Sequence, residues 1–336
     1  MEIKKLILLW SFFFLVCLGL GYPSVRRFDP RQSPGLSDTI KYYAMTTGED
    51  ESGFRYRFRC RVLVPYVARP FYLLIRARLQ DPGAGFLALL ISTAIFCATT
   101  CCLIVTLGNR AFADQLVGVL GATIYLLNFA IANLQLAGMI DAGETCLMAA
   151  LIWSLLSNRW YLLPLWGIVG ALAKETYVPF AFVFTLTWWW FETAERRVRR
   201  ARLKYILLLA VLGLVTVALT HFLITKQFIW PWQIANDERA AANLLGSAWR
   251  ITRSKELWYL FVWLLPLGVV RLKDFPRAWV RATAATVIVA LALGVFNDAK
   301  GNVARAFFDV AGPLLSLSVA AFFARFLTYK SLKASA

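Results

Sequence analysis

This sequence has little negative charge and almost no histidine. Of its 336 residues only 19 are Asp or Glu, one is His, and all charged residues together make up 16%. A soluble protein of this length would need much more polar surface, so that class is excluded. The six cysteines show no zinc or iron–sulfur spacing. The sequence also lacks a Gly-rich phosphate loop, a serine nucleophile elbow and a metal-ligand helix motif.

Apolar residues dominate instead. They make up 60% of the chain, and the mean hydropathy is +0.62. A hydrocarbon core about 30 Å thick needs about 20 mostly apolar residues per helix, so the sequence predicts an all-α polytopic membrane protein with about ten transmembrane helices. The predicted spans are 4–22, 84–107, 113–134, 138–157, 159–175, 176–193, 205–227, 255–271, 277–297 and 302–325.

The chain is predicted to form a single transmembrane domain, 1–336, with one large loop, 22–83, between the first two spans. Lys4 and Lys5 precede the first apolar run, and no small-x-small cleavage site follows it, which favours an uncleaved anchor. Lys and Arg gather in the short loops on the side of the N-terminus, as cytoplasmic loops do. We therefore expect a multi-pass protein of the inner (cell) membrane, with both termini in the cytoplasm and the 22–83 loop outside.

The formal net charge is +17, which raises the question of nucleic-acid binding. Topology and contact with the anionic headgroups of membrane lipids explain most of this charge. The basic run Arg196–Arg202 follows the sixth predicted span, where it is typical of a stop-transfer anchor. We expect membrane lipids as partners and no nucleic acid.

Three patterns stand out in the 22–83 loop. Ser37 can cap a short helix that begins at Asp38. The segment Val62–Leu79 is apolar except for three arginines, a pattern typical of an irregular helix in the membrane interface. In 55–61 every second residue is Arg, and a strand would place the four guanidinium groups on one side whereas a helix would spread them. Phosphate binding and attraction to lipid headgroups both fit this run.

Ionisable residues at the predicted outer helix ends have two interpretations each. Polar groups at membrane depth usually face a cavity or each other. The number of ionisable residues at these helix ends therefore suggests a cleft for a charged ligand. Asp38 fits the positive end of a helix dipole, or a general base. Lys174 and Glu175 fit a local ion pair, or a ligand-facing lysine. Arg305 and Asp309 are four residues apart and most simply satisfy each other.

Three short motifs indicate a family. Residues 37–43 read SDTIKYY, 59–65 read RCRVLVP, and 170–176 read GALAKET at the end of a predicted span. With an N-terminal inner anchor, a large outer loop with an early aspartate, and many further spans, the chain resembles the GT-C superfamily of integral-membrane glycosyltransferases. The resemblance covers most of the chain in topology, but only these pieces in residues.

The resemblance implies an inverting glycosyltransferase that takes a sugar from a polyprenyl-phosphate-linked donor and passes it to an acceptor outside the cytoplasm. Asp38 would match the catalytic acidic residue of the first loop. Many members have paired acidic residues there, whereas Thr39 follows here, so we expect no metal and no cofactor. The predicted substrate- and phosphate-binding residues are Tyr42, Arg59, Arg61, Lys174, Glu175 and Arg305.

Other functions remain open. A transporter or flippase of a lipid-linked or anionic substrate would use the same basic outer face without a catalytic base, but the internal repeat typical of such proteins is not visible in the sequence. A polymerase or ligase of surface polysaccharide would differ mainly in its acceptor. A membrane scaffold would have no need of the charged outer face.

Overall fold

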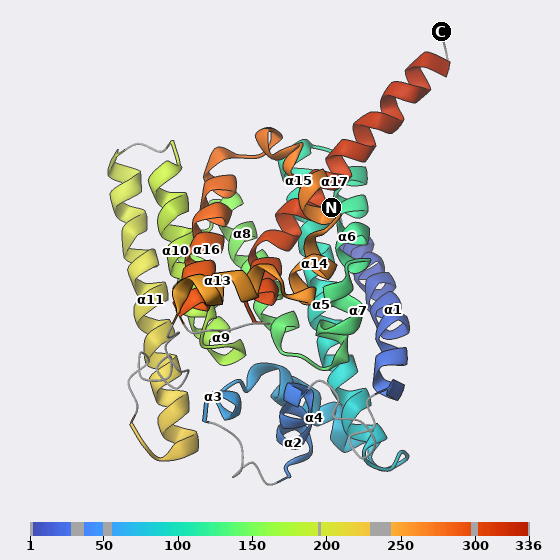
Figure 1. The fold of residues 1–336 in the computed structure, drawn as a ribbon, viewed down its shortest axis with the longest axis vertical. Coiled ribbons are helices and arrows are strands. Elements are labelled where there is room, and N and C mark those ends of the chain that lie inside the picture. The colour runs from blue at the N-terminus through green and yellow to red at the C-terminus, as the bar shows by residue number, and fades with distance from the viewer. Residues whose placement is uncertain are drawn as a thin grey trace.

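The computed structural model describes residues 3–27, 37–49, 56–193, 196–228, 243–296 and 302–334. Every regular element in these ranges is a helix, as predicted for an all-α fold (Figure 1). The helices are α1 (Ile3–Arg27), α2 (Ser37–Thr47), α3 (Tyr56–Arg59), α4 (Leu63–Ile75), α5 (Gly83–Phe112), α6 (Gln115–Leu126), α7 (Phe129–Asn133), η1 (Gln135–Ala137), α8 (Asp141–Leu156), η2 (Trp160–Leu162), α9 (Leu163–Ala173), α10 (Tyr177–Phe191), α11 (Arg196–Thr225), α13 (Leu244–Thr252), α14 (Lys255–Phe261), α15 (Leu264–Val269), η3 (Leu272–Asp274), α16 (Arg277–Phe296) and α17 (Asn302–Ala334).

Several of these helices are long and apolar enough to cross a membrane. Among the described residues there are five, within α1, α5, α11, α16 and α17, or six if α6 and the α7–η1 segment, bent by 44°, form one span. The predicted count of ten is therefore not confirmed. Two of the predicted spans contain helices of only 16 and 15 residues, α8 and α10. At about 1.5 Å per residue such helices are shorter than a hydrocarbon core of about 30 Å.

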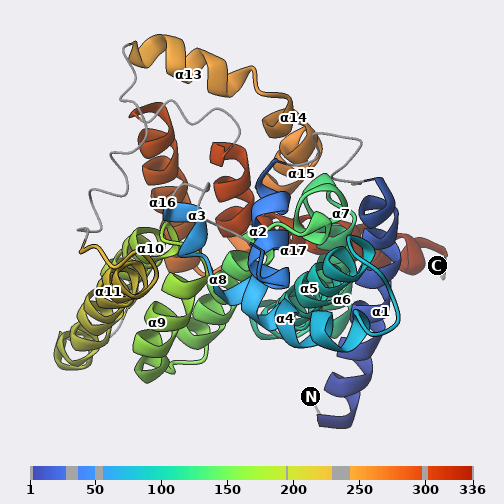
Figure 2. The ribbon, with the colours of Figure 1, turned by 90° about the horizontal axis from the view of Figure 1, so that it is seen from below.

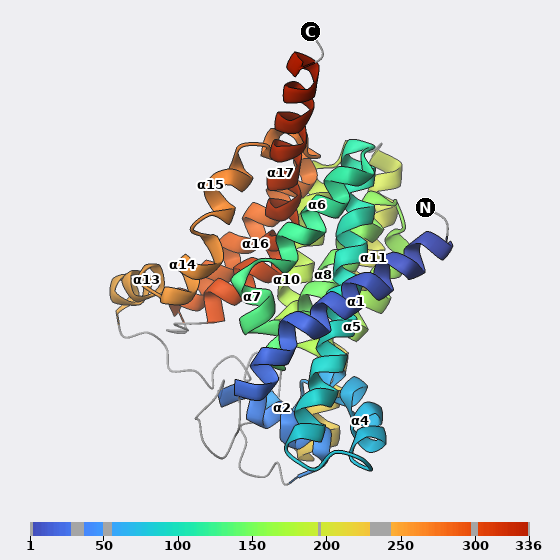
Figure 3. The same ribbon diagram turned by 90° about the vertical axis from the view of Figure 1, so that its right-hand side faces the viewer.

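The helices form a bundle with two distinct ends. In Figures 1 and 3, the beginning of α1 and the end of α17 both lie toward the upper end of the bundle. The helices of the predicted first loop, α2, α3 and α4, lie at the lower end. Figure 2, viewed from below, shows α2 and α3 over the middle of the bundle. The lower end is the one that the charge distribution predicts to face outside.

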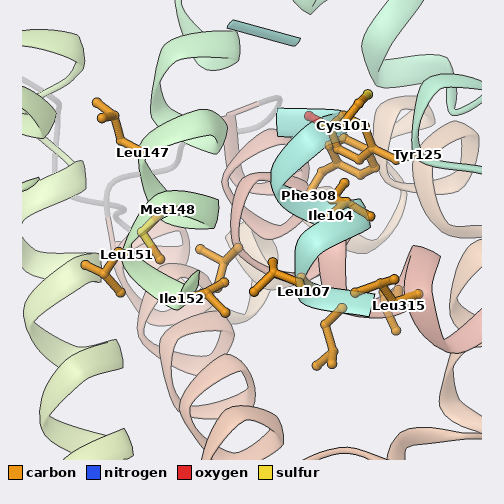
Figure 4. Packing of buried hydrophobic residues seen from close by; sticks show 14 of the residues in the cluster. Cys101, Ile104, Leu107, Tyr125, Leu147, Met148, Leu151, Ile152, Phe308 and Leu315 are labelled. Carbon is orange, nitrogen blue, oxygen red and sulfur yellow. The ribbon is translucent and has the colours of Figure 1, made fainter. Parts of the chain in front are cut away.

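The helices α5, α8 and α17 are the most deeply buried long helices of the bundle. The apolar windows of α5 and α17 are 72% and 78% buried, whereas that of α1 is only 11% buried. Leu107 of α5 and Ile152 of α8 belong to the same apolar cluster, and Tyr125 stacks on Phe308 with 5.4 Å between ring centroids (Figure 4). The outer helices leave apolar side chains exposed, and an apolar outer surface suits a lipid environment.

The segment predicted as an interfacial helix forms α4. Its buried residues, Val64, Pro65, Ala68 and Tyr72, lie on one side, while Leu74 on another side is 74% exposed. The helix packs against α5, so it is part of the bundle as well as of its surface. Burial on one side and apolar exposure on the other fit a helix at the membrane interface.

Close contact between α5 and α6 depends on two glycines. A Cβ atom at Gly118 would lie 2.5 Å from the carbonyl oxygen of Val105, and one at Gly108 would lie 2.6 Å from the Cα of Gly118. We expect Gly118→Ala to destabilise the fold by about 1–3 kcal/mol, because the backbones must separate. Thermal unfolding in detergent measures this. Gly19→Ala is the matched control, since nothing lies within 4 Å of a Cβ there; equal effects of both changes would contradict the packing.

Candidate functional site

Charged side chains from distant parts of the chain meet at the lower end of the bundle. They come from α2, from the turn after α3, from the first turn of α8, from the junction of α9 and α10, and from the beginning of α17. We call this group the charged cluster. Its members are Asp38, Tyr42, Arg61, Asp141, Glu144, Lys174, Glu175, Arg305 and Asp309.

Lys174 lies at the centre of three carboxylates. Its Nζ is 2.8 Å from Asp141 Oδ1, 2.5 Å from Glu144 Oε2 and 3.9 Å from Asp309 Oδ2. The side chains of Glu144 and Asp309 are 1% and 2% exposed. Thr176 donates a hydrogen bond to the other oxygen of Glu144 at 3.1 Å. Buried charges require partners of opposite sign, so Lys174 is the counter-ion of this acidic group.

The expected ion pair between Lys174 and Glu175 is not formed. Lys174 ends α9 in an extended conformation, with φ −165° and ψ 137°. Successive side chains of extended backbone point in opposite directions. Lys174 therefore faces Asp141 and Glu144, while Glu175 faces Arg61.

Arg61 is held by two partners. Its Nε donates to Glu175 Oε2 at 2.8 Å, a terminal nitrogen donates to Oε1 of the same carboxylate, and the other terminal nitrogen donates to the Tyr42 hydroxyl at 3.1 Å. Burial alone would lower the pKa of Arg61, but Glu175 and Tyr42 more than compensate and raise it. Burial would raise the pKa of Glu175, yet the charge and hydrogen bonds of Arg61 bring it below its usual value. Both side chains of the pair are therefore charged, with the guanidinium fixed in orientation.

Arg305 pairs across the bundle rather than along its own helix. Its guanidinium donates to Asp141 Oδ2 at 3.2 Å. Asp309, expected to be its partner, instead accepts a hydrogen bond from Thr145 at 2.6 Å. The expectation was wrong because the first turn of α8 packs beside α17 and brings a carboxylate closer. Asp141 thus joins Lys174 and Arg305, one on each carboxylate oxygen.

Asp309 is the end of a buried polar chain. Gln135 donates to Thr145 at 3.0 Å and to Asp309 at 3.5 Å, and accepts from the Tyr125 hydroxyl at 3.2 Å and from Cys97 at 3.4 Å. Sequence patterns gave no indication of Gln135 or Thr145. A lone glutamine among apolar residues is the one signal that could have found this chain, because buried polar groups require partners.

Asp38 lies in the first turn of α2, as expected. Its carboxylate is 2.8 Å from Lys41 Nζ, and both side chains are 22% exposed. Lys41 also lies 3.5 Å from the ring centroid of Phe58. Asp38 lies one turn before Tyr42 on α2, and Tyr42 accepts a hydrogen bond from Arg61, so Asp38 lies at the edge of the charged cluster. The structural role and the catalytic role of Asp38 are both compatible with this position.

The arginine run does not form a strand. Residues 56–59 form the single-turn helix α3 instead. Arg61 belongs to the charged cluster, whereas Arg59 is the last residue of α3. Arg55 lies outside the described residues, and so does the side chain of Arg57. One of the predicted first-loop arginines is thus placed in the cluster.

The three buried carboxylates have the composition of a cation site. Ligand oxygens of Asp141, Glu144 and Asp309 lie within 4.8 Å of one another. The ammonium group of Lys174 lies between them, so a divalent cation would have to displace it. We therefore assign the role of counter-ion to the three carboxylates to Lys174. The expected absence of a metal stays a prediction.

The helices and the charged cluster define an all-α protein with several helices suited to a membrane. Comparisons with protein-family models, curated proteins and solved structures find no match to this chain. The resemblance to GT-C glycosyltransferases therefore stays a prediction from the sequence.

Proposed function

We propose that the protein is an inverting glycosyltransferase that moves a sugar from a polyprenyl-phosphate donor to an acceptor on the extracytoplasmic side. One observation supports this above all. Arg61 follows α3 and Arg305 lies at the beginning of α17, far apart in sequence, yet both join the charged cluster at the end of the bundle predicted to face outside. Asp38 lies one turn before Tyr42, the hydrogen-bond partner of Arg61. Two oriented guanidinium groups at the end of apolar helices, with a carboxylate one turn away from the partner of one of them, suit a lipid that carries a phosphate.

The chemistry needs few protein groups. The acceptor oxygen attacks the anomeric carbon of the sugar, and its proton passes to the carboxylate of Asp38. The bond from the anomeric carbon to the phosphate oxygen breaks, and the lipid phosphate leaves with the electron pair. Arg61 and Arg305 stabilise the negative charge of that phosphate through their own positive charge and through the N–H groups that Glu175, Tyr42 and Asp141 do not use, since a guanidinium group has five N–H donors.

Lys174 has a different role in this proposal. Its ammonium group already contacts Asp141, Glu144 and Asp309, which leaves little positive charge for a phosphate. We assign it to holding Asp141, which in turn contacts Arg305. Glu175 likewise holds Arg61 and does not itself contact the donor.

The test uses membranes that contain the protein, supplied with polyprenyl-phosphate sugars labelled in the sugar. We expect Arg61→Lys and Arg305→Lys to lower the initial rate of sugar transfer at least tenfold at low donor concentration. Lysine keeps the positive charge that Glu175 and Asp141 require as a partner. It lacks the planar guanidinium group, which can donate two parallel hydrogen bonds to one phosphate or carboxylate. The matched control is Arg202→Lys, because Arg202 pairs with Glu192 at the opposite end and is 12% exposed, against 11% for Arg61. Unchanged transfer by both site variants at normal protein level would contradict the proposal.

A transporter of a lipid-linked or anionic substrate is the second function to consider. The bend of 44° between α6 and the α7–η1 segment favours it, since transporters often use broken helices near their substrate. The same assay separates the two functions. A transporter would move the labelled donor across a sealed vesicle membrane and leave the bond between sugar and phosphate intact.

A further inference from the structure

The upper end of the bundle carries a second charged surface that the proposed function does not use. It lies where α10 ends, α11 begins and α16 begins, and the contacts of α10 with both neighbours hold it together. We call it the basic–aromatic patch. Its residues are exposed: Trp190 and Phe191 on α10, Arg197, Arg200 and Lys204 on α11, and Arg281 on α16.

The basic residues of the patch share one surface. Arg197, Arg200 and Lys204 are three and four residues apart, so they lie on one face of α11. Arg281 reaches the same place from α16, because its guanidinium lies 4.3 Å from the ring centroid of Phe191.

No acidic residue neutralises this patch in the part of the chain that the structure describes. The nearby carboxylate of Glu192 is bound by Arg202 at 2.5 Å. The guanidinium of Arg199 lies over the rings of Trp189 and Trp190 at 4.4 and 5.3 Å, and Lys204 Nζ lies 4.8 Å from the ring centroid of Tyr205; contacts with rings leave the positive charges in place. None of the salt bridges among the described residues includes Arg197, Arg200 or Lys204. Among the described residues, the positive charges of Arg197, Arg200 and Lys204 therefore have no salt-bridge partner.

Apolar surface adjoins the positive charge. Trp190 is 62% exposed, and further along α11 the side chains of Leu207, Leu208 and Val211 are 51%, 42% and 55% exposed. Aromatic rings beside basic side chains, followed by an apolar helix face, are typical of the level where headgroups meet acyl chains. A nucleic acid or an acidic peptide would match the charge but not this apolar face.

We propose that the basic–aromatic patch binds the headgroup of an anionic phospholipid, with Arg197, Arg200 and Lys204 on the phosphate and Trp190 beside the glycerol and upper acyl chain. The apolar face of α11 below the patch contacts the chains. This binding is independent of sugar transfer, because the patch and the charged cluster lie at opposite ends of the bundle (Figure 1).

The experiment measures how many phospholipids stay bound when the full-length protein is released from micelles and analysed by native mass spectrometry. The micelles contain phosphatidylglycerol and phosphatidylcholine in equal amounts. We expect the wild type to retain phosphatidylglycerol preferentially, and the triple variant Arg197→Gln, Arg200→Gln, Lys204→Gln to lose that preference by roughly tenfold or more. Each basic residue near an anionic surface contributes roughly fivefold, which sets this expectation.

Two controls make the result decisive. The double variant Arg197→Lys, Arg200→Lys keeps the charge and is expected to keep the preference. Inorganic phosphate, added as a competitor at the lipid concentration, is expected to displace no lipid, because it lacks the apolar part. An unchanged preference in the triple glutamine variant, or equal retention of both lipids by the wild type, would overturn the proposal.

Discussion

Replacing Lys174 by methionine is expected to remove most of the folded protein. The change leaves Asp141, Glu144 and Asp309 buried together, with the Arg305–Asp141 pair as the one salt bridge left to them among the described residues. Removing one partner of a buried ion pair costs about 3–5 kcal/mol, and native proteins are stable by only about 5–15 kcal/mol. The yield of monodisperse protein in detergent and its unfolding temperature measure the effect.

A matched lysine provides the control. Lys41 also pairs with a carboxylate at 2.8 Å, but both partners are 22% exposed. Exposed pairs contribute about 0–1 kcal/mol, so Lys41→Met is expected to unfold close to the wild type. The double variant Lys174→Met, Glu144→Gln is expected to recover part of the loss, because one uncompensated charge is gone. Normal stability of Lys174→Met would show that Lys174 is not the counter-ion of the acidic group.

Replacing Asp38 by asparagine is expected to abolish most sugar transfer with little effect on folding. General acid–base catalysis contributes about 10²–10⁴-fold, and the rate of transfer at saturating donor is expected to fall by that factor. The structural cost is small, since the pair with Lys41 is partly exposed and asparagine suits the beginning of a helix. Initial rates in membranes, normalised to the protein level, measure the effect.

The control for Asp38→Asn is Asp114→Asn. Asp114 caps α6 by accepting a hydrogen bond from the backbone nitrogen of Leu116, and it follows the end of α5 that lies away from the charged cluster. Asparagine caps helices as well as aspartate does, so transfer is expected to stay at the wild-type rate. Retained transfer by Asp38→Asn at normal protein level would remove Asp38 as the base.

The sequence predicted the helices better than the spans. Apolar runs identified the long helices α5 and α17, and Ser37 with Asp38 identified the beginning of α2. Hydropathy does not show where a helix bends or stops. The break between α6 and α7 and the short length of α8 depend on contacts with neighbouring helices. Such contacts cannot be predicted from amino-acid composition.

The sequence predicted which residues would gather, but not how they would pair. Lys174 and Arg305 were expected near one another from their positions at predicted outer helix ends, and Arg61 from the family resemblance; all three lie in one cluster. Their partners come from other helices, Glu175 for Arg61 and Asp141 for Arg305. Neighbours along the chain were the wrong guide because tertiary packing brought closer carboxylates.

Photo-crosslinking of the donor tests the central claim most directly. A polyprenyl-phosphate sugar with a photoreactive group beside the phosphate is bound to the purified full-length protein and activated, and the linked peptides are identified by mass spectrometry. The account predicts links to residues 37–61 and 302–309, lost with excess unlabelled donor but retained with excess phosphatidylglycerol. Links confined to the opposite end, at 190–204, or links that unlabelled donor does not displace, would contradict it.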